Sequence, residues 1–399
     1  MSLNSTPTGD RIHIGFFGKR NAGKSSLINA VTNQSVSIVS DVSGTTTDPV
    51  YKTMEILPLG PTVIIDTPGI DDVGELGEMR VKRTKSVLNK TDVAVIIADA
   101  RVGITSEEEK LIELIKDKNI SYIIAYNKCD LLDKVPENKD ETVYVSAQKN
   151  IGIEQLKEKI ASLNSVKEEK FIVSDLIDEK DLILLVVPID TSAPKGRIIL
   201  PQNQTIRDIL DKNAVSIVCQ PEEIECVINS LNKKPRLVIT DSQVFEVADK
   251  YTPDDIDLTS FSILMARYKG LLNSAVRGVK AIENLKDNDT VLIAEGCTHH
   301  RQCEDIGTVK IPALLRKYTG KNLNFENVSG NEFPEDIEKY SLIVHCGGCM
   351  LSEREVKYRV KCAEDKNVPI TNYGICLGYL KGVLKRGIKI FPDLYNYLY

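Results

Sequence analysis

Two groups of residues near opposite ends of the chain have types and spacings that could carry chemistry. The first is Gly18-Lys-Arg-Asn-Ala-Gly23-Lys24-Ser25, a glycine-rich segment that ends in a lysine and a hydroxyl. The second joins Cys297-Thr-His299 to His345-Cys346-Gly-Gly-Cys349. Backbone N–H groups in a glycine-rich loop bind phosphate, and thiolates bind zinc or iron–sulfur clusters. The sequence therefore predicts a nucleotide site and a soft-metal site on one polypeptide.

The glycine-rich segment predicts a phosphate-binding loop between a strand and a helix. Lys24 would place its charge on the β- and γ-phosphates, and the Ser25 hydroxyl would ligate Mg²⁺. An Asp-Thr-Pro-Gly run ends an apolar strand, so that Asp66 can hold Mg²⁺ through water and the Gly69 N–H can reach the γ-phosphate. Thr46, in a Gly-Thr-Thr-Thr-Asp run, is the switch threonine expected to reach both Mg²⁺ and the γ-phosphate.

Recognition of the base is predicted at the ends of two further strands. In Asn127-Lys128-Cys129-Asp130 the aspartate carboxylate can accept two N–H bonds that guanine offers and adenine does not. Ser146 and Ala147 can support the base with a main-chain N–H. We expect hydrolysis to be carried by Lys24, Asp66 and Thr46. The full set expected to bind the nucleotide is Asn21, Ala22, Gly23, Lys24, Ser25, Ser26, Thr46, Asp66, Gly69, Asn127, Lys128, Asp130, Ser146 and Ala147.

Together these motifs look like a GTPase, and they resemble the Era and tRNA-modification branch. Ile70 follows the Asp-Thr-Pro-Gly run, so the glutamine that orients water in Ras-like proteins is absent. In that branch the asparagine of the loop, here Asn21, coordinates a potassium ion. The resemblance implies slow, potassium-stimulated hydrolysis of GTP to GDP and phosphate, with Mg²⁺ and K⁺ as cofactors.

The cysteines predict a metal site of one of two kinds. Cys346 and Cys349 follow one apolar strand and Cys297 follows another, so the three should converge at the carboxyl ends of neighbouring strands. A structural zinc site suits these donors, although zinc ribbons use paired Cys-x-x-Cys knuckles on hairpins. Three cysteines are also a common ligand set for a [4Fe–4S] cluster with one open iron. Glu304, His345 and His299 are the three candidates for the fourth ligand.

A GTPase motif set followed by Cys-x-His and His-Cys-x-x-Cys resembles the GTPase scaffold of the [FeFe]-hydrogenase maturation system, over the whole chain. The resemblance implies a homodimer that binds a [4Fe–4S] cluster, receives a transient diiron precursor from radical-SAM hydrogenase maturases and delivers it to apo-[FeFe]-hydrogenase. Neither nucleic acid nor membrane is an expected partner. One alternative is a ribosome- or tRNA-associated GTPase with a structural zinc module and a basic RNA-binding face. Another is a redox enzyme that uses the cluster for electron transfer.

Both sites need α/β elements to position them. Short apolar strands alternate with amphipathic helices from residue 11 to about 163, as in a parallel, doubly wound sheet. The strands are expected at 11–17, 62–65, 92–98, 121–126 and 142–145. Helices should begin at Lys24, Ser106 and Ile153, with Ser106 and Glu109 as a capping box. The expected fold class is α/β with three domains: a P-loop GTPase fold at 9–165, a small α/β dimerisation domain at 172–262 and an α/β [4Fe–4S]-binding domain at 263–399.

The composition sets the remaining limits. A chain of 399 residues is too long for one ordinary core, and its net charge of −6 provides no overall basic surface for nucleic acid. Residues 1–10 lack the apolar core of a signal peptide, and the longest apolar runs fall short of the ~20 residues that span a bilayer. We therefore expect a cytoplasmic protein with reduced thiols, of which Cys129, Cys219 and Cys226 are inert.

Overall fold

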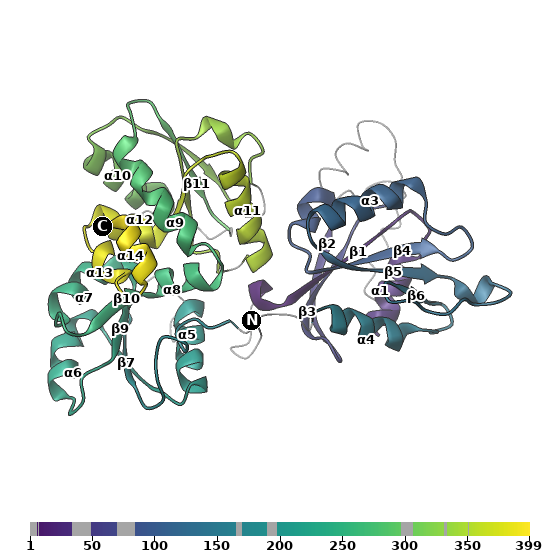
Figure 1. The fold of residues 1–399 in the computed structure, drawn as a ribbon, viewed down its shortest axis with the longest axis horizontal. Coiled ribbons are helices and arrows are strands. Elements are labelled where there is room, and N and C mark those ends of the chain that lie inside the picture. Colours follow the sequence, from purple (N-terminus) through teal and green to yellow (C-terminus); the bar gives the residue numbers. More distant parts are fainter. Residues whose placement is uncertain are drawn as a thin grey trace. The chain divides into compact units, whose positions relative to one another are not determined.

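The computed structural model describes residues 6, 8–33, 49–69, 84–164, 170–189, 198–296, 306–330, 333–349 and 351–399. The chain divides into two compact units, Met1–Glu168 and Glu169–Tyr399. Each unit is a layered α/β structure in which helices pack against the faces of a sheet (Figure 1).

The first unit is built on one six-stranded sheet in the order β2-β3-β1-β4-β5-β6. All neighbouring strands are parallel except β2 and β3, which form an antiparallel hairpin. The prediction of a parallel sheet is therefore wrong at one edge, where β2 exposes most of its residues and lacks the apolar run of a buried strand. The strands are β1 (Ile12–Gly18), β2 (Val50–Ile56), β3 (Gly60–Asp66), β4 (Val93–Asp99), β5 (Ser121–Asn127) and β6 (Thr142–Tyr144).

Helices cover both faces of this sheet (Figure 1). Helices α1 (Lys24–Thr32), α3 (Ser106–Asp117) and α4 (Ile153–Asn164) begin at the predicted residues. The predicted capping box is wrong by one residue, because Thr105 is the last residue with extended backbone and its partner is Glu108. Side chains alternate along β1, so that Phe16 belongs to one apolar cluster and Phe17 to the cluster on the other face.

The second unit contains two four-stranded parallel sheets, with orders β10-β9-β7-β8 and β12-β11-β13-β14. The sequence predicts strands at 182–187, 214–219, 236–240, 291–294, 322–326 and 341–344 and near Pro369, and the structure has a strand at each of these places. The edge strand β10 was missed because its four residues, Asp257–Ser260, begin with a charge and contain two hydroxyls. The other strands are β7 (Leu182–Val186), β8 (Val215–Cys219), β9 (Leu237–Thr240), β11 (Thr290–Ala294), β12 (Asn324–Val328), β13 (Leu342–His345) and β14 (Ile370–Asn372).

One apolar cluster of the second unit includes residues from both sheets, such as Leu184 of β7 and Leu292 of β11. The predicted boundary at residue 262 between a dimerisation and a cluster domain stays a prediction. The helices are α5 (Leu200–Asp211), α6 (Ile224–Ser230), α7 (Phe245–Tyr251), α8 (Phe261–Tyr268), α9 (Leu272–Val279), α10 (Ile311–Thr319), α11 (Glu353–Asp365), α12 (Tyr373–Leu380), α13 (Leu384–Gly387) and α14 (Pro392–Leu398). Over the described part of the chain, no helix has the length and hydropathy of a membrane span.

Helix α9 approaches strand β14 so closely that Gly278 leaves no room for a side chain. A Cβ at this position would lie 2.1 Å from the carbonyl oxygen of Ile370. We predict that Gly278→Ala lowers the free energy of unfolding of the second unit by about 1–3 kcal/mol, because helix and strand must separate. Gly378→Ala in α12 is the matched control, because its Cβ would make contacts no closer than 3.5 Å. Thermal and urea unfolding should show a loss for the first variant and none for the second.

Candidate functional site

The segment between β1 and α1 has the local geometry of a phosphate-binding loop. Asn21 and Gly23 adopt left-handed backbone conformations, with φ of 61° and 90°, and α1 begins at Lys24. Successive N–H groups in such a turn can converge on an anion. The Lys24 ammonium crosses the loop and donates to the carbonyl oxygens of Gly18 (2.8 Å) and Lys19 (3.0 Å). The lysine is therefore held over the loop that the sequence predicts to bind phosphate.

Two oxygen donors meet beside this loop. Strand β3 is parallel to β1 and ends at Asp66, and the Ser25 hydroxyl at the start of α1 lies 3.5 Å from the Asp66 carboxylate. Burial raises the pKa of Asp66, while the charge of Lys24 and the Ser25 hydrogen bond act in the opposite direction. A carboxylate and a hydroxyl are hard ligands of the kind that Mg²⁺ prefers. The Thr46 and Ile70 predictions fall outside the described residues.

Asn127 connects three of the predicted nucleotide-binding segments. Its Nδ2 donates to the carbonyl oxygen of Ala22 (3.0 Å), and its Oδ1 accepts the Ala147 N–H (3.1 Å). A Cβ on Gly23 would lie 2.3 Å from the same Nδ2, so the loop needs glycine there. The asparagine thus braces the loop against the segment that follows β6.

Lys128 forms a second connection and reveals a residue that the sequence reasoning missed. Its ammonium donates to the carbonyl oxygen of Asn21 (2.7 Å) and to the Asp99 carboxylate (2.8 Å). The guanidinium of Arg101 also binds Asp99, and hydrogen bonds from Arg101 and Lys128 hold the pKa of Asp99 well below its usual range. Asp99 ends the apolar strand β4, as Asp66 ends β3, and this shared position could have identified it.

The remaining predicted nucleotide residues lie near the same edge of the sheet or on α1. Ser146 is fully buried, and its Oγ accepts the Lys149 N–H (3.1 Å). Asp130 is half-buried in a short turn of 3₁₀-helix after β5, Gly69 is half-buried after β3, and Ser26 is exposed on α1.

The bracing role of Asn127 can be tested by substitution. Asn127→Ala should weaken GDP binding about tenfold or more, because the carbonyl of Ala22 and the N–H of Ala147 both lose a buried partner. Titration of a fluorescent GDP analogue measures the change. Asn89→Ala is the control, because it removes a buried amide that contacts Lys118 elsewhere in the unit. Equal affinity of both variants would contradict the bracing role.

The predicted thiol site lies at the carboxyl edge of the last sheet. Strands β11 and β13 are neighbours, with Ala294 opposite His345. Cys346 follows β13, and its half-buried Sγ accepts N–H bonds from Gly296 (3.0 Å) and Gly348 (3.3 Å). Gly296 directly precedes Cys297 in the chain. The structure therefore brings the described ends of the two predicted ligand segments together.

The donors at this edge fit a soft metal. Cys346 and Cys349 are both half-buried thiols in one turn, and N–H bonds to a cysteine sulfur are a feature of iron–sulfur sites. Within the described ranges no group of three or more His, Cys, Asp or Glu side chains could hold a metal ion. Cys297, His299 and Glu304 lie outside those ranges. His345 is 1% exposed, and its ring packs inside the unit.

Two family models match consecutive segments of the second unit. The hydrogen maturase F dimerization domain matches residues 172–270, and the hydrogen maturase F tetramerization domain matches residues 273–390. This chain belongs to the hydrogen maturase F family. A third model, described as a 50S ribosome-binding GTPase, matches residues 13–128, so the first unit contains a GTPase domain. The resemblance on which the sequence analysis relied is thereby confirmed.

The matches add one feature that the sequence analysis did not contain. The segment predicted to bind the cluster carries the name of a tetramerization domain, in addition to the predicted dimerisation domain before it. This chain therefore matches two family models named for self-association, and only the dimerisation domain was expected.

Curated relatives of this hydrogen maturase F chain are tRNA modification GTPases named MnmE. The protein from Desulforamulus reducens is 38% identical over 169 residues, which cover 40% of this chain and 36% of the relative. The protein from a Thermoanaerobacter species is 34% identical over 170 residues, covering 39% and 36%. The chain thus matches about a third of the length of these relatives.

Solved structures resemble the chain more weakly. A crystal structure of Era in complex with MgGDPNP and part of 16S ribosomal RNA is 21% identical, and the match covers 52% of this chain and 92% of that one. Its TM-score is 0.35, and that of a probable GTP-binding protein engB is 0.32 at 23% identity. Likeness at this level carries no argument about function.

Burial makes three other thiols of this chain poorly reactive. Burial raises the pKa of Cys219 to about 11 and that of Cys376 to about 12, and it also raises the pKa of Cys129. A thiol is a poor nucleophile and a poor metal ligand until it is deprotonated. The prediction that Cys129 and Cys219 are inert agrees with these shifts, whereas Cys226 is exposed.

Alkylation of the native protein can check this ranking. Brief treatment with iodoacetamide at pH 8, followed by peptide mass spectrometry, should modify Cys226 and spare Cys376, because only the first is exposed and the second stays protonated. Treatment in denaturant is the control and should label both cysteines equally. Modification of Cys376 in the native protein at the rate of Cys226 would contradict the burial argument.

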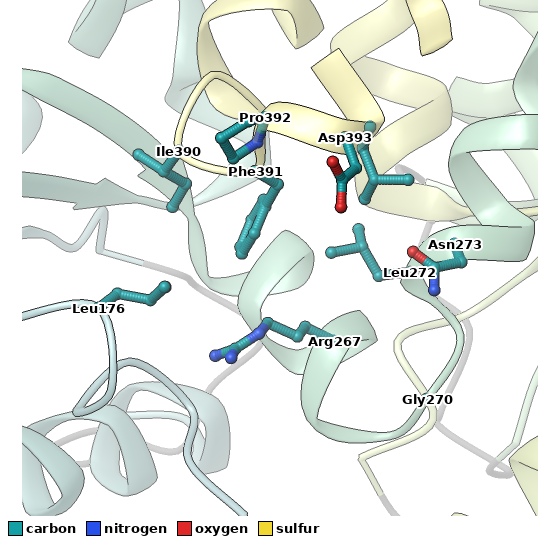
Figure 2. Close-up of a pocket in the computed structure, with 10 residues that line it drawn as sticks. Leu176, Arg267, Gly270, Leu272, Asn273, Ile390, Phe391, Pro392 and Asp393 are labelled. Carbon is teal, nitrogen blue, oxygen red and sulfur yellow. The ribbon is translucent and has the colours of Figure 1, made fainter. Parts of the chain in front are cut away.

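A cavity of about 420 Å³ lies within the second unit and contains none of the predicted site residues (Figure 2). Arg267 extends along its wall and forms an ion pair with Asp175, and Phe391 and Asp393 come from the opposite side. Asp175 already neutralises the charge of Arg267. The lining of this cavity therefore does not indicate a particular ligand.

Proposed function

We propose that this protein is a GTP-hydrolysing scaffold of hydrogenase maturation that binds a [4Fe–4S] cluster and a diiron precursor and delivers the precursor to apo-[FeFe]-hydrogenase. The observation that supports this proposal most is the contact between Cys346 Sγ and the Gly296 N–H in a hydrogen maturase F chain. That contact joins the two cysteine segments at one sheet edge, on a chain that also carries a GTPase domain.

The first unit would bind and hydrolyse GTP. Lys24 would neutralise the β- and γ-phosphates, Ser25 and Asp66 would hold Mg²⁺, and Thr46 would close on the metal and the γ-phosphate. Asn21 would coordinate K⁺, and Asp130 would select guanine through paired hydrogen bonds. The left-handed conformation of Asn21 and the contact of Ser25 with Asp66 support these roles.

The second unit would bind the cluster through Cys297, Cys346 and Cys349. When bound, the cluster would supply an open iron to which the precursor attaches. The N–H bonds to Cys346 Sγ support this role, because they favour the thiolate and disperse its charge. Glu304, His299 and His345 are the candidates for a fourth ligand.

The protein would form the expected homodimer, and the segment that matches the tetramerization domain would join two such dimers. Radical-SAM maturases and apo-hydrogenase would be its other partners in the cytoplasm. The nucleotide state can control their exchange only if GTP and GDP forms differ in affinity for them. The two alternatives remain outcomes of the test below: a structural zinc module on an RNA-acting GTPase, and a cluster that serves only electron transfer.

Reciprocal variants test the proposal. Anaerobic reconstitution with iron and sulfide should give wild type a reduced-state [4Fe–4S]⁺ EPR signal, and Cys297→Ala/Cys346→Ala/Cys349→Ala should lose it but keep GTP hydrolysis, because the second unit has its own core. Lys24→Ala should keep the signal and lose hydrolysis about a hundredfold or more. Hydrolysis by wild type should be faster in K⁺ than in Na⁺.

Three results would contradict the proposal in different ways. Stoichiometric zinc without a cluster would favour the structural-zinc alternative. A cluster that binds no diiron complex would favour electron transfer. A loaded protein that fails to activate apo-hydrogenase would remove the delivery role while leaving the cluster in place.

A further inference from the structure

The turn that carries Cys346 and Cys349, here called the thiol turn, is followed by helix α11, which contributes both members of a buried ion pair. None of the roles proposed above uses this pair. Arg359 is fully buried, and Glu355 and His345 are 3% and 1% exposed. A buried guanidinium is stable only when its donors have partners. Arg359 Nε donates to Glu355 Oε1 (3.0 Å), Nη2 donates to the carbonyl oxygen of Gly330 (2.9 Å) and Nη1 lies 3.3 Å from His345 Nε2. The ring of Phe333 lies 5.3 Å from the guanidinium carbon.

These contacts determine which nitrogen of His345 carries the proton. A guanidinium has donors and no acceptor, so His345 Nε2 must accept from Arg359. The other ring nitrogen, Nδ1, lies 2.7 Å from the carbonyl oxygen of Cys346, which can only accept. Nδ1 therefore carries the proton and donates it. Both ring nitrogens are engaged within the protein, and neither has a lone pair left for a metal.

The hydrogen bond from His345 is one of four that hold the backbone and sulfur of Cys346 in place. The backbone N–H of Cys346 donates to the Ala294 carbonyl (2.8 Å), its carbonyl accepts from His345, and its Sγ accepts from Gly296 and Gly348. Bonds on both sides of Cα restrict φ and ψ, and so fix the direction in which the thiol leaves the strand. The ring of His345 therefore lies behind the cysteine as a support.

We propose that the buried Glu355–Arg359 pair holds His345 as a positioning residue for Cys346, and that His345 is not a ligand of the cluster. This inference rests on the proposed cluster function. Ligation through Nε2 would require His345 to leave Arg359 with an unpaired buried donor, and ligation through Nδ1 would release the Cys346 carbonyl. The fourth ligand is then left to Glu304 or His299. Partners of this kind behind a metal ligand orient it and tune its affinity.

Two substitutions of His345 separate a support from a ligand. The amide nitrogen of asparagine can occupy the position of Nδ1, and that of glutamine the position of Nε2. His345→Asn therefore keeps a donor for the Cys346 carbonyl, whereas His345→Gln loses it. A supporting role predicts that the reconstituted Asn variant retains more iron and sulfide per chain than the Gln variant. Equal loss in both would overturn the proposal.

Pulsed EPR of the reduced cluster provides a readout that stability does not affect. If His345 is not a ligand, no strong ¹⁴N coupling of wild type arises from its ring. Any such coupling in wild type should therefore persist in His345→Asn and His345→Gln. A nitrogen coupling lost in both variants would identify His345 as a ligand and end the proposal.

The ion pair is tested at Arg359. Arg359→Met should weaken iron binding about tenfold or more and broaden the EPR line, because His345 loses the partner that fixes its ring. Arg386→Met is the matched control: Arg386 is also mostly buried in this unit, but it binds Asp249 and the carbonyls of Thr252 and Pro253. Circular dichroism of the iron-free proteins should first establish that both variants fold.

If Arg359→Met does not fold, Glu355→Gln replaces it, because this variant keeps the acceptor oxygen and removes the charge. It should also weaken iron binding. Unchanged binding in the variant that folds would refute the positioning role. Failure of wild type to take up a cluster would instead refute the proposed function, so the two failures are distinct.

Discussion

The hydrogen bonds between parallel strands determine where chemistry can occur in this protein. A parallel ladder places the carboxyl ends of neighbouring strands at one edge of the sheet. The chain leaves the buried layer there, so polar side chains can follow without the cost of full burial. Asp66, Asp99 and Asn127 end three strands of the first sheet, and His345 ends a strand of the third. The strands that lead up to these residues are mostly apolar. Both candidate sites therefore follow from the registers of the sheets.

Much of this arrangement could be predicted, because buried parallel strands are continuous apolar runs and their helices have clear starts. The two strands that were missed, β2 and β10, lie at sheet edges and carry polar or charged residues. The capping box was misplaced because Thr105 and Ser106 are both good N-caps, and only the backbone conformation distinguishes them. Local sequence patterns describe a strand's burial well, but they carry little information about its neighbours.

The residues of the candidate sites could also be predicted only in part. The loop glycines, Lys24 and the cysteines have recognisable spacings, whereas Asp99 and Arg359 are identified by their contacts with Lys128 and His345, which form only in the folded chain. Asn127 was expected among the residues that bind the nucleotide, and its side chain joins Ala22 to Ala147. Such bracing depends on three segments that meet only in the folded sheet. A motif names the residues of a site, while the contacts that hold them become visible only in three dimensions.

The short connection between β13 and α11 has a consequence for finding related sites. Glu355 and Arg359 follow Cys346 by nine and thirteen residues, on the helix that immediately follows the thiol turn. The spacing of four residues on one helix turns both side chains toward the same side. The thiol turn and the buried ion pair are thus encoded in one contiguous segment of the chain. A search pattern that extends the Cys-x-x-Cys signature through these two charges would distinguish turns built on such a support from pairs of cysteines that occur by chance.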